Sequence, residues 1–256
     1  MLALKEVSLK FSGREILNQV SLEICSGECM VLWGLNGAGK SSLLDILSGW
    51  RVPDSGNIFL EEKLLSQWKS LERASRVAYL AQYHEIYFDA SVLELLENKN
   101  NVLKLKFEQL LNIFNLNNSD LLTRRLGSLS GGEKAKIALL RALLQLEISL
   151  EESLERFYEG RYLLLDEPLA HLDMAYQKDL YRYLMGFKQQ GLGLIMIIHD
   201  LNQAWKYADR FLILANGKLW ECETPEEILR VCESEHGLKL KYVPLAQGVE
   251  GEGFFI

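Results

Sequence analysis

The chain has 256 residues, and its 28 Lys and Arg against 35 Asp and Glu give a formal charge of −7 at pH 7. This acidic balance argues against a broad nucleic-acid surface, which needs an excess of basic residues. Because the chain is 48% apolar with only 4 Pro and 19 Gly, a collagen-like or wholly disordered chain is excluded and a sizeable core is expected.

No segment predicts a membrane span or a secretory signal. The longest apolar runs fall well below the ~18 residues that a span requires, and the charged pair Lys5-Glu6 interrupts the N-terminal segment. The cysteines form no zinc-like double pair, so we expect reduced thiols rather than a disulfide framework or a metal site. They are Cys25, Cys29, Cys222 and Cys232.

The start of the chain predicts two kinds of strand. Apolar and polar residues alternate over 7–11 and 20–24, on either side of a turn at 12–14, which predicts an antiparallel sheet. Residues 29–33 are apolar on both faces, which is typical of a strand buried inside a covered sheet. A glycine-rich turn and an apolar-periodic helix over 41–47 follow.

The middle of the chain is mostly helical in pattern. A turn at 53–56 precedes a short strand at 57–60, and helical periodicity then dominates residues 91–126. Asn-rich breaks are expected at 98–101 and 117–119.

The second half returns to buried strands. A long helix follows Ser130, and apolar strands at 162–165 and 194–198 are separated by a helical stretch. Buried strands that alternate with helices predict a parallel α/β core. We therefore expect a single domain over 1–256, with a helical subdomain at about 83–146 inserted in the core.

Residues 147–160 carry glutamates mostly at three- and four-residue spacings, and like charges so placed repel one another along a helix. Two interpretations remain open for this stretch. It is either a solvated surface excursion or a partner-facing, regulatory loop.

A glycine-rich loop follows the first buried strand. The run Gly34-Leu35-Asn36-Gly37-Ala38-Gly39-Lys40-Ser41 fits G-x-x-x-x-G-K-[ST] between a predicted strand and a predicted helix. Glycines let backbone N–H groups surround a polyphosphate, and the helix N-terminus adds positive potential. We expect Lys40 to reach the outer phosphates and the Ser41 hydroxyl to bind Mg²⁺. The alternative is a glycine-rich turn with a chance lysine.

Two consecutive carboxylates end the buried strand at 162–165. We expect Asp166 to hold Mg²⁺ and Glu167 to polarise the attacking water. Because neighbouring side chains on a strand point in opposite directions, two adjacent acids can perform two tasks. The alternative is a strand that simply ends in an acidic turn at Pro168.

One more motif indicates a family. In the run Leu129-Ser130-Gly131-Gly132-Glu133, Ser130 and Glu133 form a capping box that predicts a helix start. With the two preceding motifs it resembles the ATP-binding cassette of ABC transporters, and the resemblance covers nearly the whole chain. It implies a P-loop ATPase core with an N-terminal antiparallel β-subdomain and an inserted α-helical subdomain.

The resemblance implies a site shared between two copies of the chain. Ser130 and Gly132 would contact the γ-phosphate of ATP bound to the other copy, so that a homodimer closes head-to-tail around two ATP. Gln82 would bind Mg²⁺ and sense a membrane partner, and Asp173 would organise the dimer contact. An ordinary strand-end amide and a helix N-cap are the respective alternatives.

The resemblance also implies a histidine switch and a base-stacking residue. His199 would contact the γ-phosphate and orient Glu167, whereas His84, His171 and His236 are expected to be surface residues. Phe11 would stack on adenine, with simple core packing as the alternative. The implied nucleotide-binding set is Phe11, Gly34, Leu35, Asn36, Gly37, Ala38, Gly39, Lys40, Ser41 and Ser42.

Partners and location follow from the same resemblance. One cassette without a membrane segment would act with two integral membrane permease subunits and a periplasmic binding protein, and with no nucleic acid. The chain would lie peripherally on the cytoplasmic face of the bacterial inner membrane, and ATP and Mg²⁺ are the expected cofactors. In this family, the subdomain after Gln82 contacts a cytoplasmic helix of the membrane permease partner.

Within the family, the chain is most similar to ATPases that import vitamin B12, haem and ferric siderophores. The features that carry this are Ser66-Gln67-Trp68, the insertion before Tyr162, His199-Asp200-Leu201-Asn202 and Thr224-Pro225-Glu226-Glu227, the last also a Thr-capped helix start. Residues 236–240 and 253–256 favour the vitamin B12 type, with haem or siderophore import as the alternative.

Other function classes fit less well. A DNA-repair or translation cassette usually carries a long coiled coil or a second cassette, and the sequence shows neither. A module that holds ATP without turnover would be favoured if Glu167 or His199 were absent, and both are present. The sequence therefore predicts an ATP hydrolase that drives import through closure and reopening of a dimer.

Overall fold

The structure is a computed structural model that describes residues 1–81, 91–96, 110–114, 116, 119–146, 158–168, 174–244 and 253–256. The predicted break at 98–101 and the acidic stretch at 147–157 lie outside the described residues. So do Gln82, Asp173, His84 and His171.

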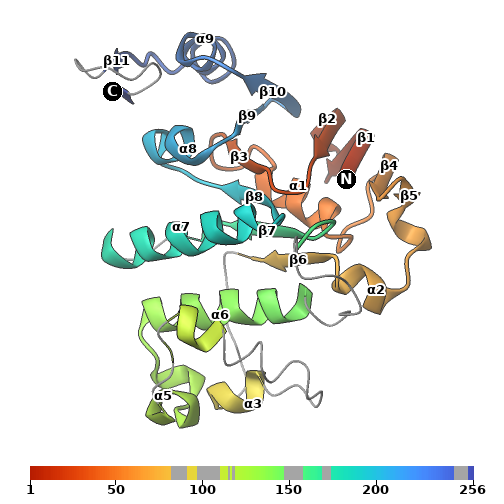
Figure 1. Cartoon of the computed structure of the whole chain (residues 1–256). Coiled ribbons are helices and arrows are strands. Elements are labelled where there is room, and N and C mark those ends of the chain that lie inside the picture. Colours follow the sequence, from red (N-terminus) through yellow and green to blue (C-terminus); the bar gives the residue numbers. More distant parts are fainter. Residues whose placement is uncertain are drawn as a thin grey trace.

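A mostly parallel sheet forms the centre of the molecule. Its strands are β3 (Cys29–Trp33), β6 (Val77–Leu80), β7 (Tyr162–Asp166), β8 (Gly193–Ile197), β9 (Arg210–Ala215) and β10 (Lys218–Cys222). They lie in the order β10-β9-β3-β8-β7-β6, with only β10 antiparallel to its neighbour (Figure 1). β3, β7 and β8 are buried along their whole length, which confirms the predicted parallel core.

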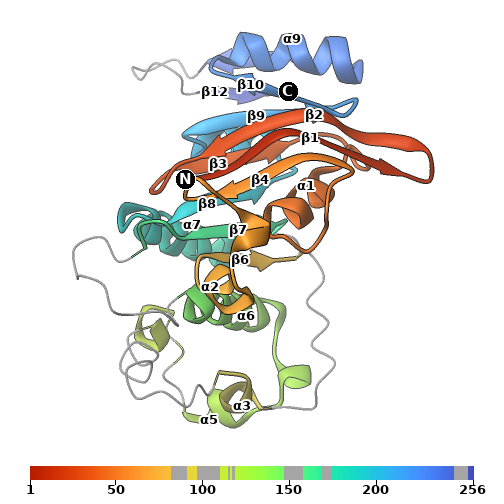
Figure 2. The same cartoon turned by 90° about the vertical axis from the view of Figure 1, so that its right-hand side faces the viewer.

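A second, antiparallel sheet lies beside the first. It consists of β1 (Leu2–Phe11), β2 (Arg14–Ile24), β4 (Ser55–Leu60) and β5 (Lys63–Leu64), in the order β2-β1-β4-β5. The helix α1 (Lys40–Leu47) lies between the two sheets (Figure 2), and its leucines share one apolar cluster with residues of both. The predicted N-terminal antiparallel sheet is therefore confirmed, and α1 is held by apolar contacts on two sides.

β1 departs from simple alternation. Its register shifts between Leu4 and Val7, where Glu6 adopts a positive φ of 51°, so both Leu4 and Val7 are buried. Such a bulge inserts one residue and bends the strand. At the far end Leu9 is buried, but Phe11 is 63% exposed, which excludes core packing as its role.

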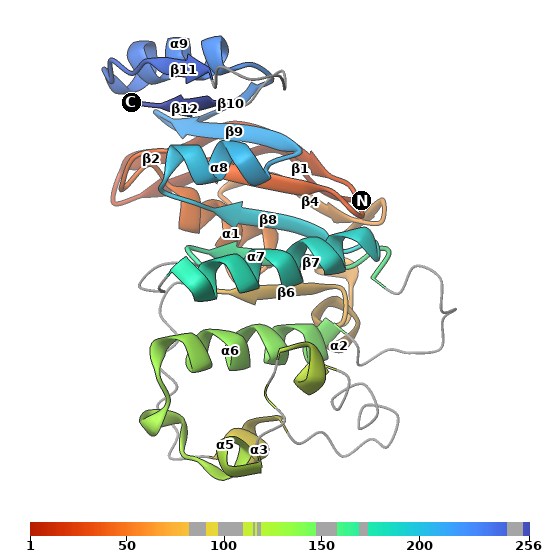
Figure 3. The same ribbon diagram turned by 60° about the vertical axis from the view of Figure 1, so that its left-hand side comes forward.

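Helices cover the other face of the parallel sheet. α7 (Met174–Gln189) and α8 (Leu201–Tyr207) lie along this face, and α6 (Gly131–Leu146) lies beside the edge strand β6 (Figure 3). Their apolar side chains form a second cluster with Cys29, Val31 and Trp33 of β3. The two faces of β3 thus serve different clusters, as expected for a strand covered on both sides.

The helical part of the chain is described only in pieces. They are α3 (Val92–Leu96), a turn of helix at 110–113, α5 (Ser119–Thr123), a short 3-10 turn at Leu126–Ser128 and α6. α6 confirms the long helix predicted after Ser130. The boundaries of the proposed subdomain, 83–146, stay a prediction. No helix within the described residues is long and apolar enough to cross a membrane.

Smaller elements complete the chain. The 3-10 turn η1 (Leu65–Gln67) and α2 (Ser70–Ala74) follow β5, and α9 (Pro225–His236) precedes the hairpin of β11 (Tyr242–Pro244) and β12 (Gly253–Phe255). α9 begins as predicted, because the Thr224 hydroxyl accepts a hydrogen bond from the Glu227 amide at 3.3 Å. The Asn202 side chain on α8 accepts a hydrogen bond from Phe255 N (2.6 Å) and donates one to Phe255 O (3.2 Å), which fastens β12 to α8.

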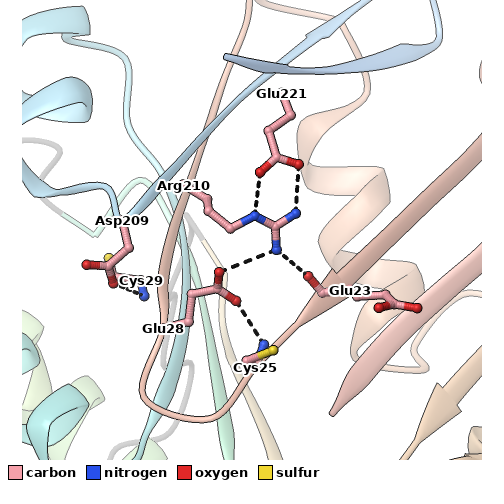
Figure 4. Close-up of polar contacts among 7 residues, drawn as sticks. All are labelled: Glu23, Cys25, Glu28, Cys29, Asp209, Arg210 and Glu221. Atoms are coloured by element: carbon pink, nitrogen blue, oxygen red, sulfur yellow. Dashed lines mark hydrogen bonds and ion pairs between the residues drawn. The ribbon is translucent and has the colours of Figure 1, made fainter. Parts of the chain in front are cut away.

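One arginine joins the two sheets at their common end (Figure 4). Arg210, the first residue of β9, donates two hydrogen bonds to the Glu221 carboxylate on β10, at 2.5 and 2.8 Å. Its third nitrogen donates to the Glu23 carbonyl of β2 at 2.7 Å and to Glu28 at 3.4 Å. A planar guanidinium suits this arrangement because its donors form a rigid fork.

Candidate functional site

The phosphate-type loop connects β3 to α1 as predicted. Its geometry requires glycine at two positions. A Cβ on Gly34 would lie 2.5 Å from the Leu214 carbonyl oxygen, and one on Gly39, whose φ is 102°, would lie 2.7 Å from an Ile16 methyl group. Since real Cβ atoms do not approach so closely, the loop can wrap this tightly only without side chains there.

Lys40 is the first residue of α1 and is only 6% exposed. Its Nζ donates to the Gly34 carbonyl at 2.8 Å and to the Leu35 carbonyl at 3.1 Å. Burial lowers the pKa of the ammonium, and the negative charges of Glu167 and Asp166 oppose that shift. The lysine is therefore held inside the loop, next to the carboxylates that end β7.

A cavity of about 580 Å³ opens over the loop and α1. It brings together residues from the antiparallel sheet, the loop and the ends of β7 and β8. Its lining is Phe11, Ile16, Asn36, Gly37, Gly39, Lys40, Ser41, Ser42, Arg51, Glu167 and His199. Gly34, Leu35 and Ala38 belong to the loop but not to this lining. Phe11 contributes an exposed aromatic face, as a base-stacking residue must.

Asp166, the last residue of β7, is 4% exposed, and its Oδ1 has no hydrogen-bond partner. Burial raises the pKa of this carboxyl; a hydrogen bond from Ser41 lowers it, and the charge of Glu167 raises it. A buried, unpartnered carboxylate oxygen beside a serine hydroxyl is a donor set that fits Mg²⁺. The described residues contain no group of three or more His, Cys, Asp or Glu suited to a metal, and Mg²⁺ needs none when phosphates supply further ligands.

Glu167 and His199 meet at the cavity wall. The Glu167 carboxylate contacts Nε2 of His199, and their side chains are 16% and 43% exposed. Glu167 reaches this position by a positive φ of 51° directly after β7. The strand alternation expected from the sequence does not describe this turn, because a left-handed residue re-aims the chain. A non-glycine residue held in that region is a frequent feature of functional sites.

The predicted capping box forms at the start of α6. Ser130 donates its backbone N–H (2.8 Å) and its hydroxyl (2.9 Å) to the Glu133 carboxylate, and the Glu133 amide donates back to Ser130 Oγ (3.3 Å). These bonds lower the pKa of Glu133. Gly132 lets α7 approach, because a Cβ there would lie 2.7 Å from the Tyr176 ring. Ser130 is exposed and does not line the phosphate cavity of its own chain.

Some site residues were not predicted, and one prediction was wrong. Arg51 lines the cavity and pairs with Asp45 at 3.6 Å, and Tyr79 on β6 hydrogen-bonds to Asp45 and Asp166. For Tyr79, the only signal in the sequence was a tyrosine inside a short apolar strand. His236, expected at the surface, is half-buried with its ring edge-on to Trp33 (centroids 5.6 Å apart), and burial lowers its pKa.

The fold and the cavity together define a nucleotide-binding α/β protein with a P-loop. The model of the family described as ABC transporter matches residues 17–149, more than half of the chain. The chain belongs to the ABC transporter family, as an ATP-binding cassette, and ATP hydrolysis in this family is coupled to transport.

Curated relatives and solved structures agree with this family. "Hemin import ATP-binding protein HmuV" of Photobacterium damsela subsp. piscicida is 36% identical over 90% of this chain and 86% of its own length. The protein of the same name in Pseudomonas aeruginosa is 34% identical over 90% and 89%.

Among solved structures, the ADP conformation of the cassette MJ1267 is 23% identical, with a TM-score of 0.74 over 91% of this chain and 95% of that one. An inward-facing putative metal-chelate type ABC transporter is 20% identical, with a TM-score of 0.75 over 100% and 96%. At these identities the structures show that the fold is the same.

Proposed function

We propose that this chain is the ATP-hydrolysing subunit of an importer for haem or a related metal chelate, and that it works as a head-to-tail dimer. The observation that carries the hydrolytic part is the contact between Glu167 and His199 at the wall of the phosphate cavity. A carboxylate in this position can orient the attacking water beside phosphates held by Lys40 and the loop amides.

The residues around the cavity fit the parts of a nucleotide. Phe11 would stack on the base at the rim, and the loop over 34–42 would surround the phosphates. Asp166, Ser41 and Gln82 would hold Mg²⁺. When bound, Mg²⁺ neutralises charge on the β- and γ-phosphate oxygens. His199 would hold Glu167 in place and contact the γ-phosphate.

The dimer proposal rests on the position of the signature. Ser130 is exposed at the start of the 16-residue helix α6 and lies outside the lining of its own cavity. Backbone N–H groups at a helix start favour phosphate. A second copy, placed head-to-tail, would bring its own Ser130 turn over this cavity, with Asp173 at the contact.

Three exposed apolar side chains support a contact with a membrane subunit. Trp50, Val52 and Leu71 are 79%, 85% and 77% exposed, which is unusual for large apolar side chains. They lie after α1 and on α2, and the packing of Gly49 against Arg73 and Leu65 holds these segments together. We propose that a cytoplasmic helix of an integral membrane permease packs against the helical subdomain after Gln82 and against these exposed side chains. Two such permeases and a periplasmic binding protein would complete the importer at the cytoplasmic face of the inner membrane.

The proposed cargo follows the relatives. Both HmuV proteins compared above are named for hemin import, and one structural neighbour is described as a putative metal-chelate type transporter. These names favour haem over vitamin B12, the cargo that the sequence favoured. Vitamin B12 remains the second candidate.

The experiment that tests the hydrolytic proposal compares the purified chain with its Glu167→Gln variant. We expect Glu167→Gln to lower kcat for ATP by about 10²- to 10⁴-fold, the range for loss of a positioned general base. The variant should also accumulate as an ATP-bound dimer, measured by size-exclusion chromatography with light scattering. Glu233→Gln, at an exposed position on α9, is the matched control and should leave both readouts unchanged. Unchanged hydrolysis in Glu167→Gln would overturn the role of Glu167.

A further inference from the structure

The loop that carries His199 is short and irregular. β8 ends at Ile197 and α8 begins at Leu201, with Asp200 as the helix N-cap. Asp200 Oδ1 accepts a hydrogen bond from the Gln203 amide at 2.8 Å, and its carbonyl accepts one from Ala204 at 2.8 Å. The His199 side chain is 43% exposed, so packing alone does not orient it.

The backbone carbonyl of His199 has a partner from a different part of the chain. The indole Nε1–H of Trp33 donates to His199 O at 2.9 Å. Trp33 is the last residue of β3 and directly precedes the phosphate loop. His199 is therefore held at two points: its carbonyl by Trp33, and its ring by Glu167.

Trp33 itself is buried and packed on several sides. It is 7% exposed and belongs to the apolar cluster beneath α7 and α8. Its backbone pairs with Ile213 of β9, and the edge of its indole ring meets the His236 ring of α9 at 79° between planes. A side chain locked by packing on several sides is suited to fix a neighbouring group precisely enough for catalysis.

We propose that Trp33 is a positioning residue for ATP hydrolysis: its indole N–H sets the orientation of the His199 peptide, and through it the approach of the His199 ring to Glu167. The inference rests on the proposed function, since it assigns a role within the same site. It adds a residue that no motif contains, and it makes the strand before the phosphate loop a physical link between Lys40 and the His199–Glu167 pair.

The link between Lys40 and Trp33 consists of one hydrogen bond and one peptide bond. Gly34 follows Trp33, is fixed against the Leu214 carbonyl, and accepts a hydrogen bond from Lys40 Nζ. A change in the contact between Lys40 and Gly34 O therefore acts on the peptide next to Trp33. Because the Trp33 indole N–H is hydrogen-bonded to His199 O, a shift of that peptide also shifts His199.

The test uses the full chain and Trp33→Phe, which keeps an aromatic ring in the core and removes the N–H donor. We expect kcat for ATP to fall by about three- to tenfold, the effect of one lost hydrogen bond. KM and the affinity for ATP should stay within about twofold of wild type, since the loop and Lys40 are intact. A second variant replaces Trp33 by benzothienylalanine, in which sulfur takes the place of the N–H at nearly constant ring shape, and it should show the same loss of kcat.

Trp68→Phe is the matched control. Trp68 also donates its indole N–H to a backbone carbonyl, Leu60 O at 3.2 Å, but in the antiparallel sheet region. We expect it to lower thermal stability about as much as Trp33→Phe while leaving kcat at the wild-type value. Wild-type kcat in both Trp33 variants would overturn the positioning role. A rise in KM together with the fall in kcat would also overturn it, because that combination indicates general loosening of the site. Absence of ATP hydrolysis by the wild-type chain would instead overturn the proposed function, and the positioning role with it.

Discussion

At the scale of single residues, Asp166 is the clearest case of a side chain whose burial disfavours its ionised form. It is 96% buried, and burial is the main cause that raises its pKa. A raised carboxyl pKa means that the folded chain binds the proton more tightly than the unfolded chain does. Ionised Asp166 therefore lowers stability at neutral pH. This cost begins to fall as the pH drops to the raised pKa, and it is gone below the ordinary pKa of an aspartate carboxyl.

We accordingly predict that Asp166→Asn stabilises the chain while abolishing ATP hydrolysis. In the absence of Mg²⁺ and nucleotide, a gain of about 1 kcal/mol would raise Tm by about 2–4 °C in a chain of this size. Asp179→Asn, on the surface of α7, is the control and should leave Tm nearly unchanged. A lower Tm for Asp166→Asn would mean that attraction from Lys40 outweighs burial.

At this scale, the sequence motifs predicted which side chains lie near one another, while the roles of these side chains stay predictions. Most residues of the loop over 34–42 line one cavity together with Glu167 and His199, as their positions at the ends of neighbouring strands imply. The positive φ of Glu167 and the bond from Trp33 to His199 were not predictable, because each depends on contacts between segments far apart in the chain. Gln82 and Asp173 stay predictions.

At the scale of elements, the start of α6 shows how two adjacent glycines differ. A Cβ on Gly132 would lie 2.7 Å from the Tyr176 ring of α7, whereas one on Gly131 would meet nothing within 4 Å. We predict that Gly132→Ala costs about 1–3 kcal/mol, as overpacking does. Gly131→Ala should cost nothing, because alanine favours a helix more than glycine.

Urea denaturation of both variants measures this difference. Activity is not the readout, since both glycines belong to the proposed signature. Equal stability of the two variants would mean that α7 moves away from α6 at little cost, and that Gly132 is not required for packing.

Elements were predicted well from local pattern and less well from tertiary contacts. Hydrophobic runs located β3, β7 and β8, and the capping residues located the starts of α6 and α9. The pairing of β4 with β1 joins residues as far apart in the chain as Leu2 and Leu60, and no local pattern encodes that. The same holds for His236, which was expected at the surface but packs against Trp33.

At the scale of the whole molecule, the cavity and the Ser130 turn are separate surfaces of one chain. If active sites are shared, two inactive variants should complement each other. Lys40→Ala removes the phosphate-binding ammonium, and Ser130→Phe blocks the signature. An equal mixture should form mixed dimers in which one site is intact, and it should regain about a quarter of wild-type ATPase activity.

The controls are the two variants alone, each at the total protein concentration of the mixture. ATPase assays across a dilution series should show the regained activity falling as dimers dissociate. A mixture no more active than the sum of its parts would place the whole site within a single chain.

The Arg210 contacts bear on how the cavity discriminates among ligands. Because one guanidinium joins the ends of β2, β9 and β10, the antiparallel sheet cannot tilt against the parallel sheet without breaking charge-assisted bonds. The separation between the aromatic rim at Phe11 and the ammonium at Lys40 is thus a property of a rigid framework. A nucleoside diphosphate and a nucleoside triphosphate with the base at this rim would then differ only in how far their phosphates extend along the cavity.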